Sequence, residues 1–335
     1  MNRFLTMVAG AAMALVVAGP ASAAADANYY KGKTITYIVA TGPGGGYDTY
    51  GRLIARFMQK QLPGSRILVR NVPGAGHIIG ANTIYAARPD GLTIGMFNTG
   101  LIYNQLMSLP GVKFDLTKMS WIGKASNEIR VVVVSTKSGY KTIDDMLKAK
   151  GPVRFAAAGV GSAAYLDTRI LDFMLPIDIQ TVSGFDGAEG ELSMMRGEVV
   201  AQVGIASSFE QFVRNKNGFY ALAMSPAAHA ILPNVPQADA YVHDEKSRKL
   251  LTLLEALSDL GRLTSGPPGI PADVLAVLRE AHLKAVQDPA LLVEAKKLAI
   301  PIDFGTADFV TRRIKEALNQ TPETIALLKQ AAAAQ

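Results

Sequence analysis

From residue 34 onward, apolar runs of strand length alternate with segments of helical periodicity. Residues 34–40 (TITYIVA) are β-branched or apolar on both faces, which is typical of a strand buried on both sides of a sheet. A helical pattern follows from about residue 47 to 61, and the unit repeats with strands at 66–71 and 93–98 around a helix at 77–87. Strands that alternate with helices of this length pair in parallel and form a doubly wound sheet.

The same alternation resumes in a second series after residue 129. The run 129–135 (IRVVVVS) is the most hydrophobic strand candidate of the chain. Further elements are expected as strands at 153–157, 177–182, 199–204 and 219–224 and helices at 162–175 and 188–196. Three prolines between 267 and 271 then lead into amphipathic helices at 272–287, 289–299 and 307–318.

These patterns predict an α/β protein of two lobes, each with a doubly wound and mostly parallel sheet, and a ligand cleft between the lobes. We assign residues 24–128 and 259–335 to the first lobe and residues 129–258 to the second. The chain would cross between the lobes near residues 127–130 and 257–263. Two lobes suit a chain of 335 residues, because single domains typically hold about 100–150 residues.

Residues 1–23 have the pattern of a secretory signal peptide. Arg3 supplies the positive charge, residues 5–18 the apolar stretch, and residues 21–23 (ASA) the small residues that a signal peptidase needs. The stretch is too short to span a bilayer comfortably. We expect cleavage near Ala23 and export to a bacterial periplasm, the alternative being an uncleaved N-terminal anchor. The sequence has no cysteine, which excludes disulfides and the cysteine of a lipid-anchored receptor.

The charge and the chemistry-bearing residues exclude several classes of function. The net charge of +6 is scattered along the chain, so no basic face for nucleic acid is predicted. The four histidines lack the spacing of metal ligands, and neither a GxSxG elbow nor an acid–base pair stands out. We therefore predict no catalytic residue, no metal site and no cofactor.

A glycine-rich loop at residues 41–48 (TGPGGGYD) is the first candidate binding element. It follows a strand and opens a helix, and ligands of open α/β sheets bind beyond the carboxyl ends of the strands. Glycine permits close approach to the backbone, and the first amides of a helix lack an internal partner, so the loop could hold a carboxylate. An ordinary tight turn is the alternative. The candidate site residues of this loop are Pro43, Gly44, Gly45, Gly46, Tyr47 and Asp48.

The second candidate element, residues 158–164 (AGVGSAA), has the same position in the other lobe. Gly159, Gly161, Ser162 and Ala163 are its candidate site residues, although a helix cap is the commoner role of a serine such as Ser162. The run Gly159-x-Gly161-x-x-Ala164 also matches a dinucleotide fingerprint, with Asp178 as the candidate ribose acid. The rival interpretation is therefore an NAD(P)-dependent oxidoreductase, which export to the periplasm disfavours.

Seven short runs stand in order along the chain: 43–48 (PGGGYD) with Arg52, 69–76 (VRNVPGAG), 88–93 (RPDGLT), 159–162 (GVGS), 196–198 (RGE), 232–236 (LPNVP) and 267–271 (PPGIP). Together they resemble the substrate-binding proteins of tripartite tricarboxylate transporters over about residues 30–314. The resemblance implies a type II periplasmic-binding fold that closes about a hinge on a small organic carboxylate. It implies a pair of integral membrane transporter subunits as the partner, and we expect the binding protein to be a monomer.

The resemblance also assigns residues to the two jaws. Residues 44–47 would hold the ligand from one lobe and residues 161–163 from the other, with Thr99 on the floor of the cleft. The chain departs from the family pattern at His77 and at 184–187 (GFDG), where Asp186 replaces a basic side chain. If Asp186 faces the cleft, it disfavours a second carboxylate and favours a hydroxyl or an amine, whereas a solvated Asp186 has no such effect. A sensor that docks on a membrane kinase is a further alternative, since its ligand chemistry would be the same.

Overall fold

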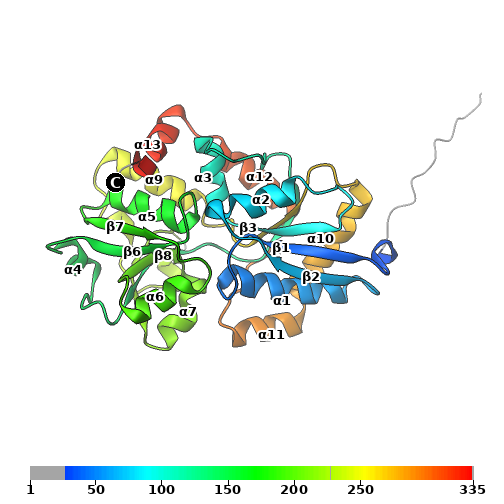
Figure 1. The fold of residues 1–335 in the computed structure, drawn as a ribbon, viewed down its shortest axis with the longest axis horizontal. Coiled ribbons are helices and arrows are strands. Elements are labelled where there is room, and N and C mark those ends of the chain that lie inside the picture. The colour runs from blue at the N-terminus through cyan, green and yellow to red at the C-terminus, as the bar shows by residue number, and fades with distance from the viewer. Residues whose placement is uncertain (1–26, 227, 334–335) are drawn as a thin grey trace, which may run out of the picture.

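The computed structural model describes residues 27–226 and 228–333, which fold into two lobes side by side (Figure 1). The first lobe holds a six-stranded sheet with the order β11-β4-β10-β3-β1-β2. Its strands are β1 (Thr34–Val39), β2 (Arg66–Asn71), β3 (Thr93–Phe97), β4 (Ser120–Lys124), β10 (Leu263–Gly266) and β11 (Gly305–Thr306). The expected signal peptide lies outside the described residues.

The second lobe holds a five-stranded sheet with the order β7-β6-β8-β5-β9. Its strands are β5 (Arg130–Ser135), β6 (Val153–Ala157), β7 (Ile179–Ser183), β8 (Ala201–Ile205) and β9 (Gly218–Ala223). Every residue of β5 is buried, as its apolar run predicts. The predicted two-lobed α/β fold is confirmed.

Both sheets are mixed, and the antiparallel pairs involve mainly the strands on which the chain enters a lobe. β1 pairs in parallel with β2 and β3, and β6 with β7 and β8. In contrast, β5 runs antiparallel to β8 and β9, and β10 runs antiparallel to β3 and β4. The chain enters β5 and β10 from the other lobe and not through a helix packed on the same sheet. The parallel pairing that a strand–helix–strand unit produces therefore does not apply to these two strands.

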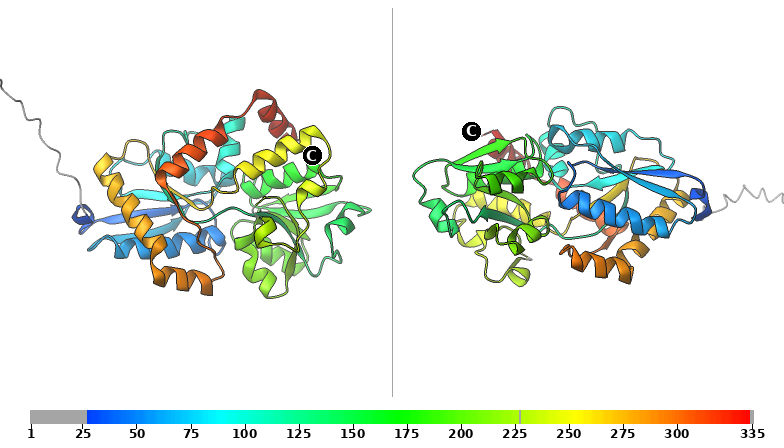
Figure 2. Two further views of the ribbon diagram at one scale, coloured as in Figure 1. Left: turned by 180° about the vertical axis from the view of Figure 1, so that it is seen from behind. Right: turned by 60° about the horizontal axis from the view of Figure 1, so that its bottom comes forward.

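Helices cover both faces of each sheet (Figures 1 and 2). The helices next to strands of the first sheet along the chain are α1 (Gly46–Lys60), α2 (Ile78–Tyr85), α3 (Gly100–Met107), α10 (Ala272–Gln287), α11 (Pro289–Lys297) and α12 (Ala307–Leu318). Those of the second series are α4 (Ile143–Leu147), α5 (Ala163–Met174), α6 (Glu189–Arg196), α7 (Ala206–Arg214), α8 (Ala228–Ile231) and α9 (Glu245–Ala256). Short 3-10 turns lie at Ala27–Tyr30, Ala75–His77 and Ala238–Ala240. None of the described helices is long and apolar enough to cross a membrane.

The last helix, α13 (Pro322–Ala333), joins elements from both parts of the chain. It contacts α3, α5 and α9, and Figure 1 shows it beside α9. Its buried side chains, among them Leu327 and Leu328, belong to an apolar core that also includes side chains of α5 and α9. The division of the chain at residue 259 stays a prediction, and these contacts favour placing α13 with the second lobe.

The lobes are joined by two neighbouring crossings of the chain. One leads from β4 to β5 and the other from α9 to β10, close to the predicted positions. The amides of Ala125 and Ser126 both lie 3.3 Å from the carbonyl oxygen of Gly261, and Ser126 and Gly261 form an antiparallel bridge. A Cβ at Gly261 would overlap the Ser126 carbonyl, so glycine permits this close approach. The paired crossings form the hinge of the molecule.

Candidate functional site

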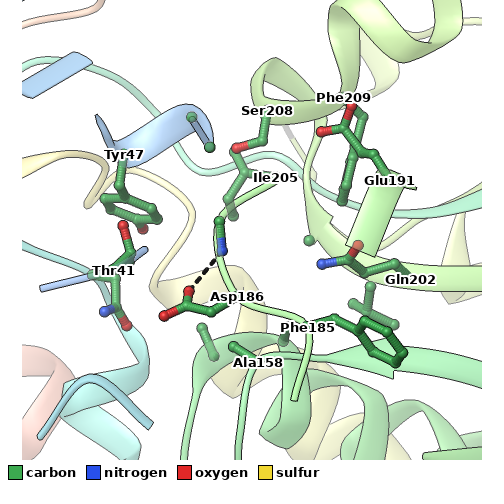
Figure 3. A pocket seen from close by; sticks show the side chains of 18 of the residues that line it. Thr41, Tyr47, Ala158, Phe185, Asp186, Glu191, Gln202, Ile205, Ser208 and Phe209 are labelled. Carbon is green, nitrogen blue, oxygen red and sulfur yellow. Dashed lines mark hydrogen bonds between the residues drawn. The ribbon is translucent and has the colours of Figure 1, made fainter. Parts of the chain in front are cut away.

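A cavity of about 100 Å³ lies between the lobes, at the carboxyl ends of strands from both sheets (Figure 3). A single water molecule needs only about 10–15 Å³ on such a measure, so the cavity has room for a small organic molecule. It has the position expected for a ligand site in open α/β sheets. The residues that line it are Thr41, Gly45, Gly46, Tyr47, His77, Asn98, Ala158, Ala163, Ala164, Asp167, Phe185, Asp186, Gly187, Glu191, Gln202, Val203, Gly204, Ile205, Ser208 and Phe209.

The first glycine loop meets the cavity with its last residues only. The amide of Gly42 donates to Asp186 Oδ2 at 3.0 Å, and that of Gly44 donates to Asp48 Oδ2 at 3.0 Å. The amides of residues 45–47 form no hydrogen bond with the described part of the chain, and these residues line the cavity. The donors that this loop leaves for an anion are therefore the amides at the start of α1.

Asp48 supports the loop and does not line the cavity. Its carboxylate accepts from Arg52 Nε at 3.0 Å and from Asn71 Nδ2 at 2.9 Å, and Arg52 lies four residues further along the same helix. Burial alone would raise the pKa of the Asp48 carboxyl, but the hydrogen bonds from Arg52, Gly44 and Asn71 lower it below its ordinary value. Asp48 thus holds the loop in place as an ionised group. Pro43 and Gly44 also lie outside the cavity lining.

The second glycine loop contributes Ala163 and Ala164 to the cavity. Ser162 caps α5, since its Oγ accepts from the amide of Tyr165 at 3.2 Å, and the amides of Ala163 and Ala164 have no partner in the described part of the chain. Gly159, Gly161 and Ser162 do not line the cavity. The start of α5 therefore lines the same cavity as the start of α1, with the same kind of free donor.

Asp186 bridges the two lobes at the edge of the cavity (Figure 3). Besides Gly42, it accepts from the amide of Gly187 at 2.8 Å, and its Oδ1 lies 3.4 Å from His77 Nε2. Burial opposes its charge, but the hydrogen bonds from His77, Gly187 and Gly42 lower the pKa of the Asp186 carboxyl below its ordinary value. Asp186 is thus an ionised carboxylate whose acceptor sites are largely filled by the protein.

A buried polar network lies beneath the cavity and joins the lobes at the hinge. Tyr47 and Thr99 each donate to the carboxylate of Glu128, and Arg130 Nη2 donates to Thr99 Oγ1 at 2.5 Å. Arg130 Nε also donates to Asp167 Oδ2 at 2.8 Å, and the side chains of Glu128 and Arg130 are fully buried. Burial opposes the charge of Arg130, but Asp167, Tyr103 and Glu128 together outweigh it and raise the pKa of the guanidinium. Thr99 therefore serves this network and does not line the cavity.

Arg262, on the second crossing, links the first glycine loop to α7. Its guanidinium lies 3.9 Å from the centre of the Tyr47 ring and 4.8 Å from that of Tyr50. Its Nη2 donates to Ser208 Oγ at 2.9 Å. The backbone of Arg262 has a φ of 53°, which is uncommon for a residue with a side chain and marks a constrained position in the hinge.

The far wall of the cavity comes from the second lobe and was not predicted. Phe185, Val203 and Phe209 make it apolar, and Glu191 and Gln202 add two polar side chains (Figure 3). Burial raises the pKa of Glu191 from its ordinary 4.5 to about 7. In the sequence, Glu191 is explained by the preference of acids for the first turn of a helix. The feature of the sequence that could have identified Glu191 as a cavity residue is its position shortly after β7, at the edge of the sheet where ligands bind.

Three glycines of the first lobe allow it to contact the second lobe around the cavity. A Cβ on Gly45 would lie 3.0 Å from Gly187 Cα, and a Cβ on Gly76 would lie 2.5 Å from the amide nitrogen of Ser162. A Cβ on Gly46 would overlap Ser208 Oγ. Real Cβ atoms essentially never come within 3.0 Å of a backbone atom, so Gly76 requires glycine while the lobes are in contact, and a side chain at Gly45 or Gly46 would force its neighbour to shift. The structure is therefore a closed arrangement of the two lobes.

The dinucleotide interpretation fails on the position of Asp178. β6 and β7 are parallel, the glycine loop follows the carboxyl end of β6, and Asp178 precedes the amino end of β7. The acid thus lies at the end of the sheet away from the loop, whereas a ribose acid must follow the second strand. His282 is buried in the first lobe, and burial lowers its pKa to about 4. Within the described chain, no three acidic or histidine side chains are grouped as metal ligands would be.

Comparisons with known proteins agree with this geometry. Residues 51–328 match the family described as "Tripartite tricarboxylate transporter family receptor". A protein of Pseudomonas sp. (strain P51), "UPF0065 protein in tcbD-tcbE intergenic region", is 26% identical over 92% of this chain and 90% of its own. The structure of the periplasmic binding protein BugD superposes with a TM-score of 0.76 at 19% identity, over 90% of this chain and 98% of BugD. MatC from Rhodopseudomonas palustris with bound malate superposes with a TM-score of 0.72 at 20% identity, over 88% of this chain and 99% of MatC.

The two structural likenesses show a shared two-lobed fold, and the family match covers most of the chain. The protein is accordingly a solute-binding receptor and not an enzyme, in line with the cavity between its lobes. The chain belongs to the receptor family of the tripartite tricarboxylate transporters.

Proposed function

We propose that this protein captures a small organic carboxylate between its lobes in the periplasm and delivers it to the integral membrane subunits of a tripartite transporter. The observation that carries this proposal is the pair of helix starts, α1 and α5, that open on one cavity with free amides. Such amides, together with the helix dipoles, favour a negative group and need no basic side chain.

In this proposal, residues 45–47 of the first lobe and residues 163–164 of the second hold the carboxylate. Asp48 and Ser162 support the two loops, and Asp186 closes the edge of the cavity against Gly42. The protein acts as a monomer after cleavage near Ala23. MatC, which shares the fold, has bound malate, a small organic acid that is consistent with this class of ligand.

A thermal-shift screen of monocarboxylates, dicarboxylates, tricarboxylates and aromatic acids tests the proposal. A ligand at ~100 times its dissociation constant adds about 2.7 kcal/mol to the free energy of unfolding, which is a readily measured shift in melting temperature. We expect at least one acid to produce such a shift and its uncharged amide to produce none. No shift with any acid, at concentrations up to the millimolar range, would contradict the proposal.

A further inference from the structure

The far wall of the cavity contains two polar groups that the protein itself does not satisfy. The carboxyl group of Glu191, in the first turn of α6, has no hydrogen bond or ion pair with the described residues. Gln202, in β8, has a buried Oε1 without a partner. Figure 3 shows both side chains on the second-lobe side of the cavity, opposite Tyr47 and Thr41. Polar groups in such a wall normally have partners, so the half-buried carboxyl group of Glu191 is available to a ligand. Gln202 Oε1 is enclosed by the protein beside Gly190, so the nitrogen end of this amide is the part that a ligand can reach.

The charges around the cavity disfavour an anion at this end. Its acidic and basic lining residues are Asp167, Asp186, Glu191 and His77, and no lysine or arginine of the described chain lines it. Asp167 is paired with Arg130 through Oδ2, although its Oδ1 has no hydrogen bond, and Asp186 is held by backbone amides and His77. Glu191 is the acid among them that has neither a hydrogen bond nor an ion pair with the described residues. A second carboxylate on the ligand would meet an acidic side chain without a compensating cation.

The groups that surround Glu191 from neighbouring elements add no free positive charge. The hydroxyl of Tyr220, in β9, donates to the carbonyl oxygen of Ala206 at 2.8 Å. On α7, Arg214 Nε donates to Glu210 at 2.8 Å, so this guanidinium is already paired. Desolvation raises the pKa of Tyr220, followed by the charge of Glu210 and a hydrogen bond with it, and the charge of Glu191 adds to this shift.

We propose that the far end of the ligand carries a hydrogen-bond donor, a hydroxyl or an ammonium group, which donates to Glu191 beside the amide of Gln202. This inference rests on the function proposed above, in which the other end of the ligand is a carboxylate at the starts of α1 and α5. The apolar walls at Phe185, Val203 and Phe209 suit a hydrocarbon segment between the two ends. The preferred class is then a hydroxy or amino monocarboxylic acid and not a dicarboxylic acid.

The raised pKa of Glu191 agrees with such a partner. Burial without a counter-charge raises this pKa to about 7, and an ammonium group beside the carboxylate would restore the ionised form. A hydroxyl would donate to the carboxylate and accept from the Gln202 amide, because a hydroxyl is both a donor and an acceptor. The two donor types therefore differ in the pH dependence of their binding, and the ammonium ligand should bind more tightly as the pH rises through about 7.

Calorimetric titration with four acids of matched length tests the inference: butanoate, succinate, 4-hydroxybutanoate and 4-aminobutanoate, with the six-carbon series alongside. At pH 7.5 we expect the hydroxy or the amino acid to bind about tenfold more tightly than the dicarboxylate of the same length, as one hydrogen bond to a charged group provides. Which of the two binds better identifies the donor. Tighter binding of the dicarboxylate would overturn the inference, whereas no binding of any acid would overturn the proposed function and the inference with it.

Two variants locate the effect. Glu191→Gln keeps the size of the side chain and should reduce the preference for the donor-bearing acid over the dicarboxylate about tenfold. The control is Glu189→Gln, which changes an exposed acid two residues earlier in the same helix. This variant should leave the ranking of the acids unchanged. An unchanged ranking in Glu191→Gln, with wild-type circular dichroism, would overturn the inference. Because this variant removes a desolvated acid, its melting temperature should equal or exceed that of the wild type, which separates loss of preference from misfolding.

Discussion

Gly45 offers a direct test of lobe closure, because its side-chain position points at the other lobe. It caps α1 with an extended backbone (φ −84°, ψ 176°), so a larger residue meets no strain within its own loop. A Cβ there would lie 3.0 Å from both Gly187 Cα and its carbonyl carbon. Carbon atoms prefer separations of about 3.5–4.0 Å, and the two γ-carbons of valine extend the overlap. Gly45→Val should therefore keep the lobes from meeting.

The expected size of the effect follows from the cost of overpacking. Extra methyl groups in a well-packed contact cost about 1–3 kcal/mol, and backbone atoms of Gly187 cannot rotate away as a side chain could. Only the closed state bears this cost, so affinity should fall about 5- to 150-fold. The amides that would bind the carboxylate remain present. Valine also caps a helix less well than glycine, but that loss affects the open and closed states alike.

Titration calorimetry with the acid found in the screen measures the affinity, and small-angle X-ray scattering measures whether the ligand compacts the protein. Gly151→Val is the matched control, because a Cβ at Gly151 has no atom within 4 Å. We expect the control to bind and compact like the wild type, and Gly45→Val to bind about 5- to 150-fold more weakly and to be less compact at a ligand concentration that just saturates the wild type. Wild-type affinity together with full compaction in Gly45→Val would refute the closed arrangement described here.

Three further predictions concern the polar groups of the structure. Arg130→Leu leaves two buried carboxylates without their counter-charge and should lower the free energy of unfolding by about 3–5 kcal/mol in urea titrations. Arg196→Leu, which breaks an exposed pair, should cost at most about 1 kcal/mol. Folding raises the pKa of Glu191 from 4.5 to about 7, so the folded protein holds this proton more tightly than the unfolded chain does. The free energy of unfolding should therefore fall as the pH rises from 4.5 to about 7. Glu191→Gln should remove this part of the pH dependence. Ser162→Ala removes the cap of α5 and should cost about 1 kcal/mol by the same measurement.

Each of these predictions can fail on its own. A loss in Arg130→Leu no larger than in Arg196→Leu would mean that the buried network contributes little to stability. Parallel pH profiles of the wild type and Glu191→Gln would mean that this carboxyl titrates normally. An unchanged urea midpoint in Ser162→Ala would remove the cap as the role of this hydroxyl.

The sequence predicts the elements whose periodicity is local. β2 (Arg66–Asn71) and α10 (Ala272–Gln287) begin and end at the predicted residues. The alternation of strands and helices is enough to predict two α/β lobes. This alternation does not predict α3 and α7, which are short helices that follow β3 and β8 with little polar patterning or without a helix-breaking residue before them. It also does not predict that β5 and β10 run antiparallel to their neighbours. These features depend on how the lobes are connected.

The candidate site divides in the same way. The glycine loops could be predicted because they combine a local composition with a position after a strand, and parts of both line the cavity. The network of Glu128, Arg130 and Asp167 could not, since its members come from the hinge, β5 and α5 and no spacing links them. Glu191 is a case in which a general preference for acids at helix starts conceals a place in the cavity wall.

Tyr47 connects the ligand cavity to the hinge, and this limits how the lobes can move. Its ring lies in the cavity lining and over Arg262, and its hydroxyl donates to Glu128 beneath. A motion that pulled these three side chains apart would remove the Tyr47 donor from the buried Glu128 carboxylate, which is costly. A rotation of the lobes costs least when its axis passes near these three side chains. In such a rotation the first residues of α1 stay in place while the far ends of the lobes move apart. The carboxylate end of the ligand would then be the pivot of the motion, and the far wall with Glu191 would be the part that leaves first.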